Sequence, residues 1–310
     1  MPVRAIRQQS FGGPEVLRLV DVDRPEPGPT EVLVGVRAAG VNPVDWKCRA
    51  APGFLKAPPF TLGWDVSGVV EAVAVGVNRF APGDEVFGMP RFPREAGAYA
   101  EYVTAPSRQL ARKPARLSHV EAAGLPLAGL TAWQILVETA DVRPGQRVLV
   151  TAAGGGVGHL AVQVAKARGA YVIGTARRAK HRFLRELGAD EVIDYTATDV
   201  TGATGDLDLV IDLLGGQSSV RAVPTLRPGG LLVPVTRGDP AIDTAAAARG
   251  VRVARFLVEP DRAGLEGLAA LVDAGQLRVE IDTVLPLADA AKAHELGEAG
   301  RTRGKIVLTP

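Results

Sequence analysis

The chain has few of the residues from which disulfide or metal frameworks are built. Its 310 residues include one cysteine, Cys48, and four histidines, His119, His159, His181 and His294. A single cysteine excludes an intrachain disulfide and every zinc site that needs several thiolates. Because the histidines are scattered along the sequence, we expect no metal site.

The chain also has few aromatic residues, little net charge and no long apolar run. Aromatic residues make up 5%, and 36 basic and 34 acidic residues give a net charge of +2. Such a balance gives no electrostatic reason to expect nucleic acid or an anionic membrane as a partner. No apolar run is long enough to span a bilayer, and the first residues lack the apolar segment of a secretory signal, so we expect a cytoplasmic protein.

The most informative stretch that is present runs from residue 148 to residue 170 and reads VLVTAAGGGVGHLAVQVAKARGA. It predicts a strand, a tight turn and an amphipathic helix, and the unpaired N–H groups at such a helix start suit a phosphate. Small residues stand at the three positions of the dinucleotide fingerprint, at Ala153, Gly155 and Gly158. A glycine-rich turn without a ligand is the alternative. We assign dinucleotide binding to Ala153, Gly155, Gly156, Val157 and Gly158.

The next strand favours a phosphorylated cofactor. NAD-binding sites place a carboxylate at the end of this strand, to hold the ribose 2′-hydroxyl. Here the strand ends at Thr175 without one, and Arg177, Arg178 and Lys180 follow at once. Arginine offers a fork of donors to phosphate oxygens, so the sequence favours NADPH over NADH. The alternative is that these cations form the solvated first turn of a surface helix.

The chain divides into a β-rich part and a part in which strands and helices alternate. Residues 1 to about 118 contain strand patterns at 31–38 and 67–75 among many glycines and prolines, which suggests a partly closed barrel. Ser118 and Glu121 form a capping-box pattern before a long apolar helix through Leu136. Alternation from 146 to 275 predicts a parallel sheet, with strands at 147–151, 171–175, 191–193, 208–213, 230–235 and, less clearly, 251–257.

Two further features complete this α/β organisation. Thr236 follows the strand 231–235 at the carboxyl edge of the sheet, where ligands bind in such folds, so we expect it to contact the cofactor. The last thirty or so residues have the pattern of a strand, a helix and a strand, ending in 305–308.

The order of motifs resembles one family, the medium-chain dehydrogenase/reductase superfamily and its zinc-free quinone oxidoreductase (zeta-crystallin-like) branch. The motifs lie at 39–45, 63–68, 79–86, 97–102, 122–127, 226–230 and 304–308, together with the fingerprint turn. The resemblance implies a GroES-like β-barrel catalytic domain over 1–118, completed by 278–310, and a Rossmann NADPH-binding domain over 119–277. It also implies a homodimer, and it places Arg178 and Tyr195 near the adenosine 2′-phosphate.

The resemblance bears on the metal as well. Alcohol dehydrogenases of this superfamily take zinc ligands from a cysteine and from a Gly-His-Glu motif. In this chain a non-ligand stands at the cysteine's place within 41–44, and Gly63-Trp64-Asp65 replaces the second motif. The structural four-cysteine loop is missing. The resemblance therefore implies an enzyme without zinc.

Without a Lewis acid, hydride transfer to an already electrophilic acceptor is expected, either a quinone or a conjugated C=C bond. The resemblance places Asn42 and Asp45 beside the nicotinamide. We expect Asn42 to be a polar positioning group, whereas Asp45 has either a direct role or caps a helix starting at Trp46. Enoyl-thioester reductases of this superfamily carry a proton-donating tyrosine at about the position of Phe54, and phenylalanine cannot donate a proton. Lys47 either takes over as the proton donor or is simply solvated.

The sequence therefore predicts an NADPH-dependent reductase of a quinone-type acceptor. An enone, alkenal or enoyl reductase acting on C=C is one alternative. An NADPH-binding sensor or structural protein with little turnover is another. Trp46, Phe54 and Trp64 either line an apolar slot for the acceptor or pack in the core. Lys305, in the closing Gly-Lys motif, is either structural or faces the active site.

Overall fold

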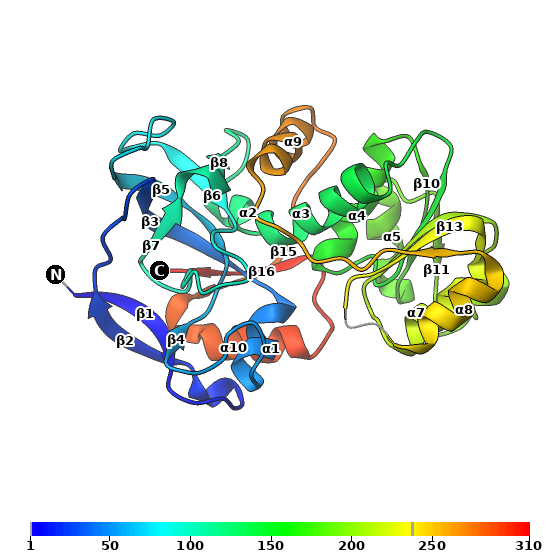
Figure 1. Cartoon of the computed structure of the whole chain (residues 1–310), viewed down its shortest axis with the longest axis horizontal. Coiled ribbons are helices and arrows are strands. Elements are labelled where there is room, and N and C mark those ends of the chain that lie inside the picture. The colour runs from blue at the N-terminus through cyan, green and yellow to red at the C-terminus, as the bar shows by residue number, and fades with distance from the viewer. Residues whose placement is uncertain (1, 237–238) are drawn as a thin grey trace. The chain divides into compact units, whose positions relative to one another are not determined.

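The computed structural model describes residues 2–236 and 239–310, and these form two compact units (Figure 1). Unit 1 comprises Met1–Leu130, Glu259–Ala274 and Val279–Pro310, and unit 2 comprises Thr131–Val258 and Gly275–Arg278. The boundaries differ from the expected 118/119 and 277/278. Residues 259–274 join unit 1 because their helix α9 (Arg262–Asp273) packs there, with Leu268 against Gly129.

Unit 1 is built on a seven-stranded sheet and a three-stranded sheet. The larger sheet has the order β15–β16–β3–β5–β6–β8, with β7 paired to β3, and the smaller has the order β2–β1–β4. The strands predicted at 31–38 and 67–75 are confirmed as β3 and β5. The strand bounds are β1 (Pro2–Gln8), β2 (Arg18–Asp23), β3 (Glu31–Val41), β4 (Phe60–Thr61), β5 (Asp65–Val73), β6 (Glu85–Gly88), β7 (Tyr102–Pro106) and β8 (Leu110–Arg112).

The C-terminal segment completes the larger sheet of unit 1. It forms β15 (Ile281–Pro286), α10 (Ala290–Glu298) and β16 (Lys305–Thr309), as the strand–helix–strand pattern predicted. Strand β16 lies antiparallel to β3, with Ile306 opposite Val41. The start of β16 is therefore next to the start of helix α1.

Helix α1 (Pro43–Ala50) begins three residues before the predicted start at Trp46. Asn42 is its N-cap and Pro43 takes the first helical position, where a missing N–H costs nothing. Asp45 thus lies in the first turn, and its Oδ2 accepts a hydrogen bond from the Asn42 N–H at 2.6 Å. The expectation that Asp45 itself would be the cap is wrong, because the helix already starts at Pro43.

The capping box at Ser118 is confirmed, but the long helix predicted after it is wrong. Ser118 Oγ accepts from the Glu121 N–H at 3.2 Å, and Glu121 accepts from the Ser118 N–H at 2.8 Å. Helix α2 (His119–Ala123) then ends at Gly124, and α3 (Pro126–Trp133) starts anew, followed by a π-helical turn over Gln134–Thr139. Pro126 has no N–H and disfavours helical geometry at the residue before it, so one continuous helix cannot form.

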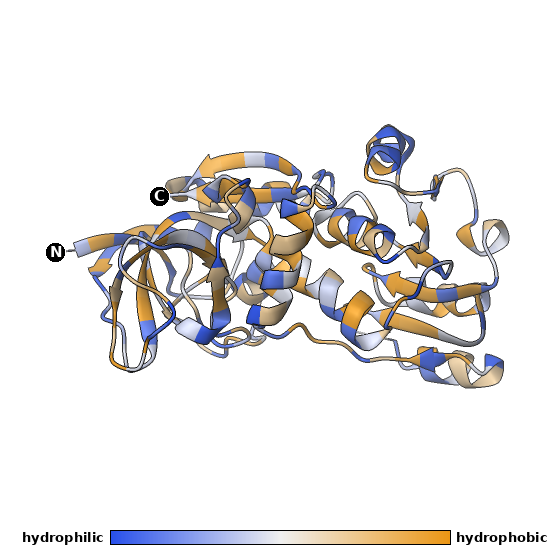
Figure 2. Ribbon diagram, turned by 90° about the horizontal axis from the view of Figure 1, so that it is seen from above, coloured by the Kyte–Doolittle hydropathy of each residue, from blue (hydrophilic) through white to orange (hydrophobic). Residues whose placement is uncertain are grey.

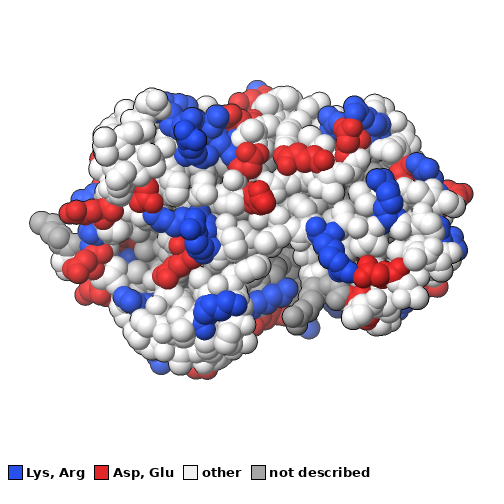
Figure 3. All heavy atoms as spheres, viewed as in Figure 1, with Lys and Arg blue, Asp and Glu red and all other residues white. Residues whose placement is uncertain are grey.

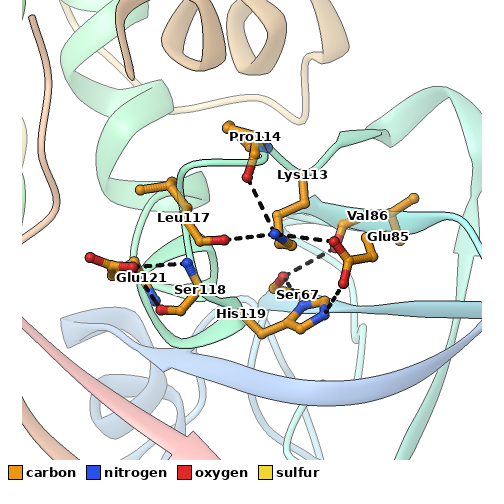
Figure 4. Close-up of polar contacts among 9 residues, drawn as sticks. All are labelled: Ser67, Glu85, Val86, Lys113, Pro114, Leu117, Ser118, His119 and Glu121. Atoms are coloured by element: carbon orange, nitrogen blue, oxygen red, sulfur yellow. Dashed lines mark hydrogen bonds and ion pairs between the residues drawn. The ribbon is translucent and has the colours of Figure 1, made fainter. Parts of the chain in front are cut away.

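His119 ties the start of α2 to the barrel (Figure 4). Its Nδ1 lies 2.8 Å from Ser67 Oγ, and its Nε2 lies 3.2 Å from Glu85, which also pairs with Lys113 at 3.2 Å. The Ser–His–carboxylate order resembles a hydrolase triad. However, Ser67 is fully buried and donates to the Val86 carbonyl at 3.2 Å. The group is therefore a structural tie.

Unit 2 is a parallel six-stranded sheet of order β11–β10–β9–β12–β13–β14. From β9 the chain moves towards β10, and from β12 it moves towards β13, so right-handed crossovers place α4 and α7 on opposite faces (Figure 1). The predicted strands are confirmed, although β14 is shorter than expected. The strand bounds are β9 (Arg147–Val150), β10 (Tyr171–Thr175), β11 (Glu191–Ile193), β12 (Leu207–Asp212), β13 (Leu226–Pro234) and β14 (Arg252–Val253).

Apolar strands and helices form the core of unit 2. Leu149, Ile173 and Leu232 from the sheet pack in one buried cluster with Ile242 of α8 (Ala241–Arg249). Figure 2 shows these strands as predominantly hydrophobic ribbons. The remaining helices of the sheet are α4 (Gly156–Ala167), α5 (His181–Glu186), α6 (Val200–Ala203) and α7 (Gln217–Ala222).

The surface carries mixed charge. On the face drawn in Figure 3, Lys and Arg side chains are interspersed with Asp and Glu. Within the described residues, no helix is both long and apolar enough to cross a membrane.

Candidate active site

The fingerprint turn of unit 2 packs tightly against the start of helix α4. Strand β9 ends at Val150, and Gly155 caps α4, so the predicted strand–turn–helix is confirmed. A Cβ on Gly158 would lie 2.6 Å from the Ala152 carbonyl oxygen, so only glycine allows this close packing of helix and turn. The N–H groups in the first turn of α4 have no intrahelical partners, and this end of the helix suits a phosphate.

Thr175 supports this turn from the neighbouring strand. Its Oγ1 accepts from the Ala152 N–H at 3.2 Å, and its carbonyl accepts from the Ala153 N–H at 3.0 Å. The side chain is 2% exposed. Thr175 therefore holds the turn in shape, and its contact with the cofactor stays a prediction.

Four predicted cofactor residues follow the neighbouring strands β10 and β11. Arg177 Nε lies 3.1 Å from the hydroxyl of Tyr195, which follows β11 and is 48% exposed. Lys180 Nζ donates to the Gly154 carbonyl at 3.3 Å. Arg178 is exposed on the same short turn. Cations and a phenol thus lie beside the fingerprint turn, while Thr236 is half-buried beyond β13, next to residues outside the described ranges.

Asp212, which the sequence analysis missed, organises the same edge of the sheet. It is fully buried at the end of β12. Its carboxylate accepts from Thr151 Oγ1 at 2.8 Å, from the Gly215 N–H at 3.0 Å and from Ser218 Oγ at 3.0 Å. A carboxylate that ends an apolar strand before two glycines is a signal that could have found it.

In unit 1, three polar side chains that are far apart in sequence meet in a buried cluster. The register of β16 on β3 brings Lys305 beside Asn42, and β5 places Asp65 opposite Gly40. Lys305 Nζ donates to Asn42 Oδ1 and lies 3.5 Å from Asp65, while Asn42 Nδ2 donates to Asp65 Oδ2 at 2.8 Å. Each of these residues is at most 3% exposed. The sequence predicts a positioning role for Asn42 and leaves the role of Lys305 open.

The cluster combines opposite charges in a dry environment. Burial raises the pKa of Asp65, and the nearby Lys305 ammonium counters that rise. Burial lowers the pKa of Lys305, and the Asp65 carboxylate counters that fall. The carboxamide of Asn42 is held between a cation at its oxygen and an anion at its nitrogen, and this contact fixes its orientation.

Asp45 adjoins this cluster and is itself fully buried. Its Oδ2 accepts from the Asn42 N–H and from the Tyr99 hydroxyl at 2.9 Å. Its Oδ1 has no hydrogen-bond partner among the described residues. Burial raises the pKa of Asp45 to about 7, against hydrogen bonds from Asn42 and Tyr99 that lower it.

Comparison with known proteins assigns most of the chain to known domain families. Residues 28–115 match the alcohol dehydrogenase GroES-like domain, and residues 187–308 match a domain described as zinc-binding dehydrogenase. The quinone oxidoreductase of Pseudomonas aeruginosa is 35% identical, covering 99% of both chains. The chain belongs to the quinone oxidoreductase branch of the medium-chain dehydrogenase/reductase superfamily.

Solved structures agree over the full chain. The Coxiella burnetii quinone oxidoreductase matches with a TM-score of 0.95 and 39% identity, covering 100% of both chains. The Escherichia coli quinone oxidoreductase in complex with NADPH matches with a TM-score of 0.89 and 30% identity, covering 99% of this chain and 100% of that one. The family and fold predicted from the motifs are confirmed. The protein is an oxidoreductase that uses a nicotinamide cofactor and a small-molecule acceptor.

The side chains in the described part of the chain do not fit a zinc ion, despite the name of the second matching domain. Across residues 2–236 and 239–310, no three His, Cys, Asp or Glu side chains gather as a metal site. The Lys305 ammonium lies within reach of both Asn42 and Asp65, where a second cation would be repelled.

The aromatic side chains expected to line a slot pack in different ways. Trp64 is 1% exposed and donates from Nε1 to the Arg94 carbonyl at 2.7 Å. Phe92 lies between Trp64 and Phe54, with ring centroids 5.4 Å from each, and Phe54 remains 43% exposed. Trp64 thus belongs to the core, whereas Phe54 presents a ring at the surface. Lys47, the alternative donor, is exposed.

Proposed function

We propose that this oxidoreductase transfers a hydride from NADPH to a quinone-type acceptor without zinc. The observation that carries the cofactor preference is the group of Arg177, Arg178 and Lys180 beside the fingerprint turn. No carboxylate ends β10 to hold a ribose 2′-hydroxyl, and Arg177 is paired with a tyrosine hydroxyl instead of an acid. Exposed guanidinium groups in that position favour a 2′-phosphate.

The proposed roles follow from where the side chains lie. The turn from Ala153 to Gly158, including Gly155, Gly156 and Val157, would hold the pyrophosphate, and Arg177, Arg178 and Tyr195 the adenosine phosphate. Thr175 would act by shaping the turn, and Thr236 stays a prediction. When bound, the nicotinamide supplies the hydride, and the protein supplies placement and charge. Asn42 would orient the nicotinamide or the acceptor with an amide group that Lys305 and Asp65 hold in place.

The choice of acceptor rests on the chemistry and on the relatives. Since the chain does not fit a zinc ion, an acceptor that is electrophilic by itself is favoured over an unpolarised carbonyl. The names of the Pseudomonas and Coxiella relatives support a quinone. An enone, alkenal or enoyl acceptor stays the alternative, as does an NADPH-binding protein with little turnover. Homodimerisation and a cytoplasmic location stay predictions.

An acceptor panel tests the proposal. NADPH consumption is followed with 1,4-benzoquinone, 9,10-phenanthrenequinone, an alkenal and an enoyl thioester. We expect saturable turnover of the quinones at the highest kcat/KM. Turnover of the C=C substrates alone would transfer the function to the alternative reductase. Tight NADPH binding without turnover of any acceptor would overturn the enzymatic proposal.

A further inference from the structure

A chain of polar side chains in unit 1 leads from the surface to the buried carboxyl of Asp45. Glu298 of α10 pairs with Arg49 of α1 at 2.8 Å. Arg49 Nη1 lies 3.2 Å from His294 Nδ1, and His294 Nε2 lies 3.3 Å from the Tyr99 hydroxyl. The hydroxyl of Tyr99 then donates to Asp45 Oδ2 at 2.9 Å. Apart from Glu298, these side chains are at most 3% exposed.

The direction of each hydrogen bond in this chain follows from its first member. A guanidinium group only donates, so His294 Nδ1 must accept and the ring proton must be on Nε2. His294 therefore donates to the Tyr99 oxygen, and Tyr99 donates onward to Asp45. Burial and the neighbouring Arg49 lower the pKa of His294 to about 3, so the ring is neutral and does not act as a counter-ion.

This arrangement makes the two oxygens of Asp45 different. Oδ2 accepts two hydrogen bonds, from the Tyr99 hydroxyl and from the Asn42 N–H at 2.6 Å. Oδ1 is buried and has no partner within the described chain. A proton bound by Asp45 must therefore be on Oδ1, because a proton on Oδ2 would face two donors.

The charges around Asp45 come from several elements. Asp65 of β5 repels a charge on Asp45, and Lys305 of β16 attracts one. Tyr99 donates to it from the segment before β7. Burial raises the pKa of the Cys48 thiol in α1, and the nearby charge of Asp45 adds to that rise. Burial outweighs the attractive contacts. The carboxyl is consequently poised to gain and lose its proton near neutral pH.

We propose that Asp45 Oδ1 holds the proton that the reduced acceptor takes up. This inference rests on the proposed function. Hydride addition leaves the acceptor as an oxyanion. Because Asp45 has no exposed surface, one water relays the transfer: the Oδ1–H bond breaks as the water gains that proton, and the water gives one of its own to the acceptor oxygen. Asp45 is left as a carboxylate that Tyr99 and Asn42 stabilise, and a solvent proton restores it.

The pH dependence of turnover tests this assignment. For the wild type, kcat/KM for the quinone should fall as the pH rises through the pKa of Asp45. Asp45→Asn, which keeps the shape, should lower kcat at pH 6 at least tenfold and abolish that fall. Tyr99→Phe removes a donor to Oδ2 and should move the falling limb to higher pH by about one unit. His119→Gln, in the separate tie to Ser67, should leave the profile unchanged.

A spectroscopic readout keeps the test independent of turnover. The infrared spectrum of the wild type at neutral pH should contain the C=O band of a protonated buried carboxyl, which Asp45→Asn removes and Tyr99→Phe retains to higher pH. An unchanged pH profile in folded Asp45→Asn, or no such band, would overturn the assignment. Loss of folding in Asp45→Asn would leave the Tyr99→Phe shift to decide. If the wild type turns over no quinone, the proposed function fails, whereas the infrared band still reports on Asp45.

Discussion

Lys305 donates a hydrogen bond to the side-chain oxygen of Asn42, although the two residues are 263 positions apart. The contact exists because the last strand, β16, pairs with β3 next to the start of α1. A buried ammonium thereby fixes the orientation of a carboxamide that we assign to the active site. The C-terminal segment thus contributes a side chain to the proposed active site.

Removal of the Lys305 ammonium should lower the stability of the protein, and removal of the opposite charge on Asp65 as well should restore it. Lys305→Met leaves Asp65 as an unpaired buried carboxylate, which should lower the free energy of unfolding by about 3–5 kcal/mol. The double variant Asp65→Asn, Lys305→Met should recover most of this loss. Urea denaturation of the three proteins measures both effects. A single variant as stable as the wild type would contradict the buried ion pair.

The two exposed arginines should set the preference for NADPH. Without Arg177 and Arg178, the charge-assisted bonds to the 2′-phosphate disappear, so the double alanine variant should raise KM for NADPH about 10- to 100-fold. KM for NADH should change little. Arg182→Ala is the matched control, since Arg182 is exposed and pairs with Glu186 on the same helix. Equal losses with NADH and NADPH would contradict the assignment.

The fingerprint turn should not accept a methyl group at its last glycine. In Gly158→Ala the added carbon would be 2.6 Å from main-chain atoms of Ala152 and Ala153, which forces the turn open. We expect NADPH binding, followed by fluorescence titration, to weaken at least tenfold and stability to fall by about 1–3 kcal/mol. Gly202→Ala is the control, because a carbon there meets nothing within 4 Å.

The stability of the protein should depend on pH through Asp45. Its folded pKa is raised from 3.8 to about 7, so its contribution is fully present below pH 3.8 and is lost as the pH rises to about 7. Relative to that of Asp45→Asn, the free energy of unfolding of the wild type should fall by at most about 4 kcal/mol over this pH range. Urea unfolding of both proteins at several pH values measures the difference, and a constant difference would contradict the shift.

His294 should act in the opposite direction. Its pKa is lowered in the folded state from 6.5 to about 3, so its contribution is present above pH 6.5 and is lost as the pH falls towards 3. His294→Gln cannot titrate, and the stability of the wild type should fall relative to it on acidification. The same unfolding series, extended to lower pH, measures this effect. If the stability of the wild type instead rises relative to that of His294→Gln in acid, the ring of His294 is not buried in its neutral form.

Much of the fold could be predicted because its signals are local. The turn around Gly155 and Gly158 lies within one short stretch, and the strands of unit 2 follow simple apolar runs. The end of α2 before Pro126 also has a local signal, but the apolar residues on both sides of it suggest one continuous helix. Local patterns therefore predict the elements better than their ends.

The buried cluster of unit 1 could be predicted only in part. Asn42 and Asp45 stood in a motif of the family, but nothing near them in sequence indicates Lys305, Tyr99 or His294. Those contacts depend on the register of β16 on β3 and on the position of α10, both of which are long-range. Asp212 has a local signal, a carboxylate at the end of an apolar strand, but its partners come from two different loops and could not be predicted.

The most direct test of the account is the specificity constant of the purified protein for NADPH and for NADH, with 9,10-phenanthrenequinone as acceptor and a metal chelator present. We expect quinone reduction that the chelator does not slow, with kcat/KM clearly higher for NADPH than for NADH. Activity that disappears with the chelator, or an equal or greater kcat/KM for NADH, would contradict it.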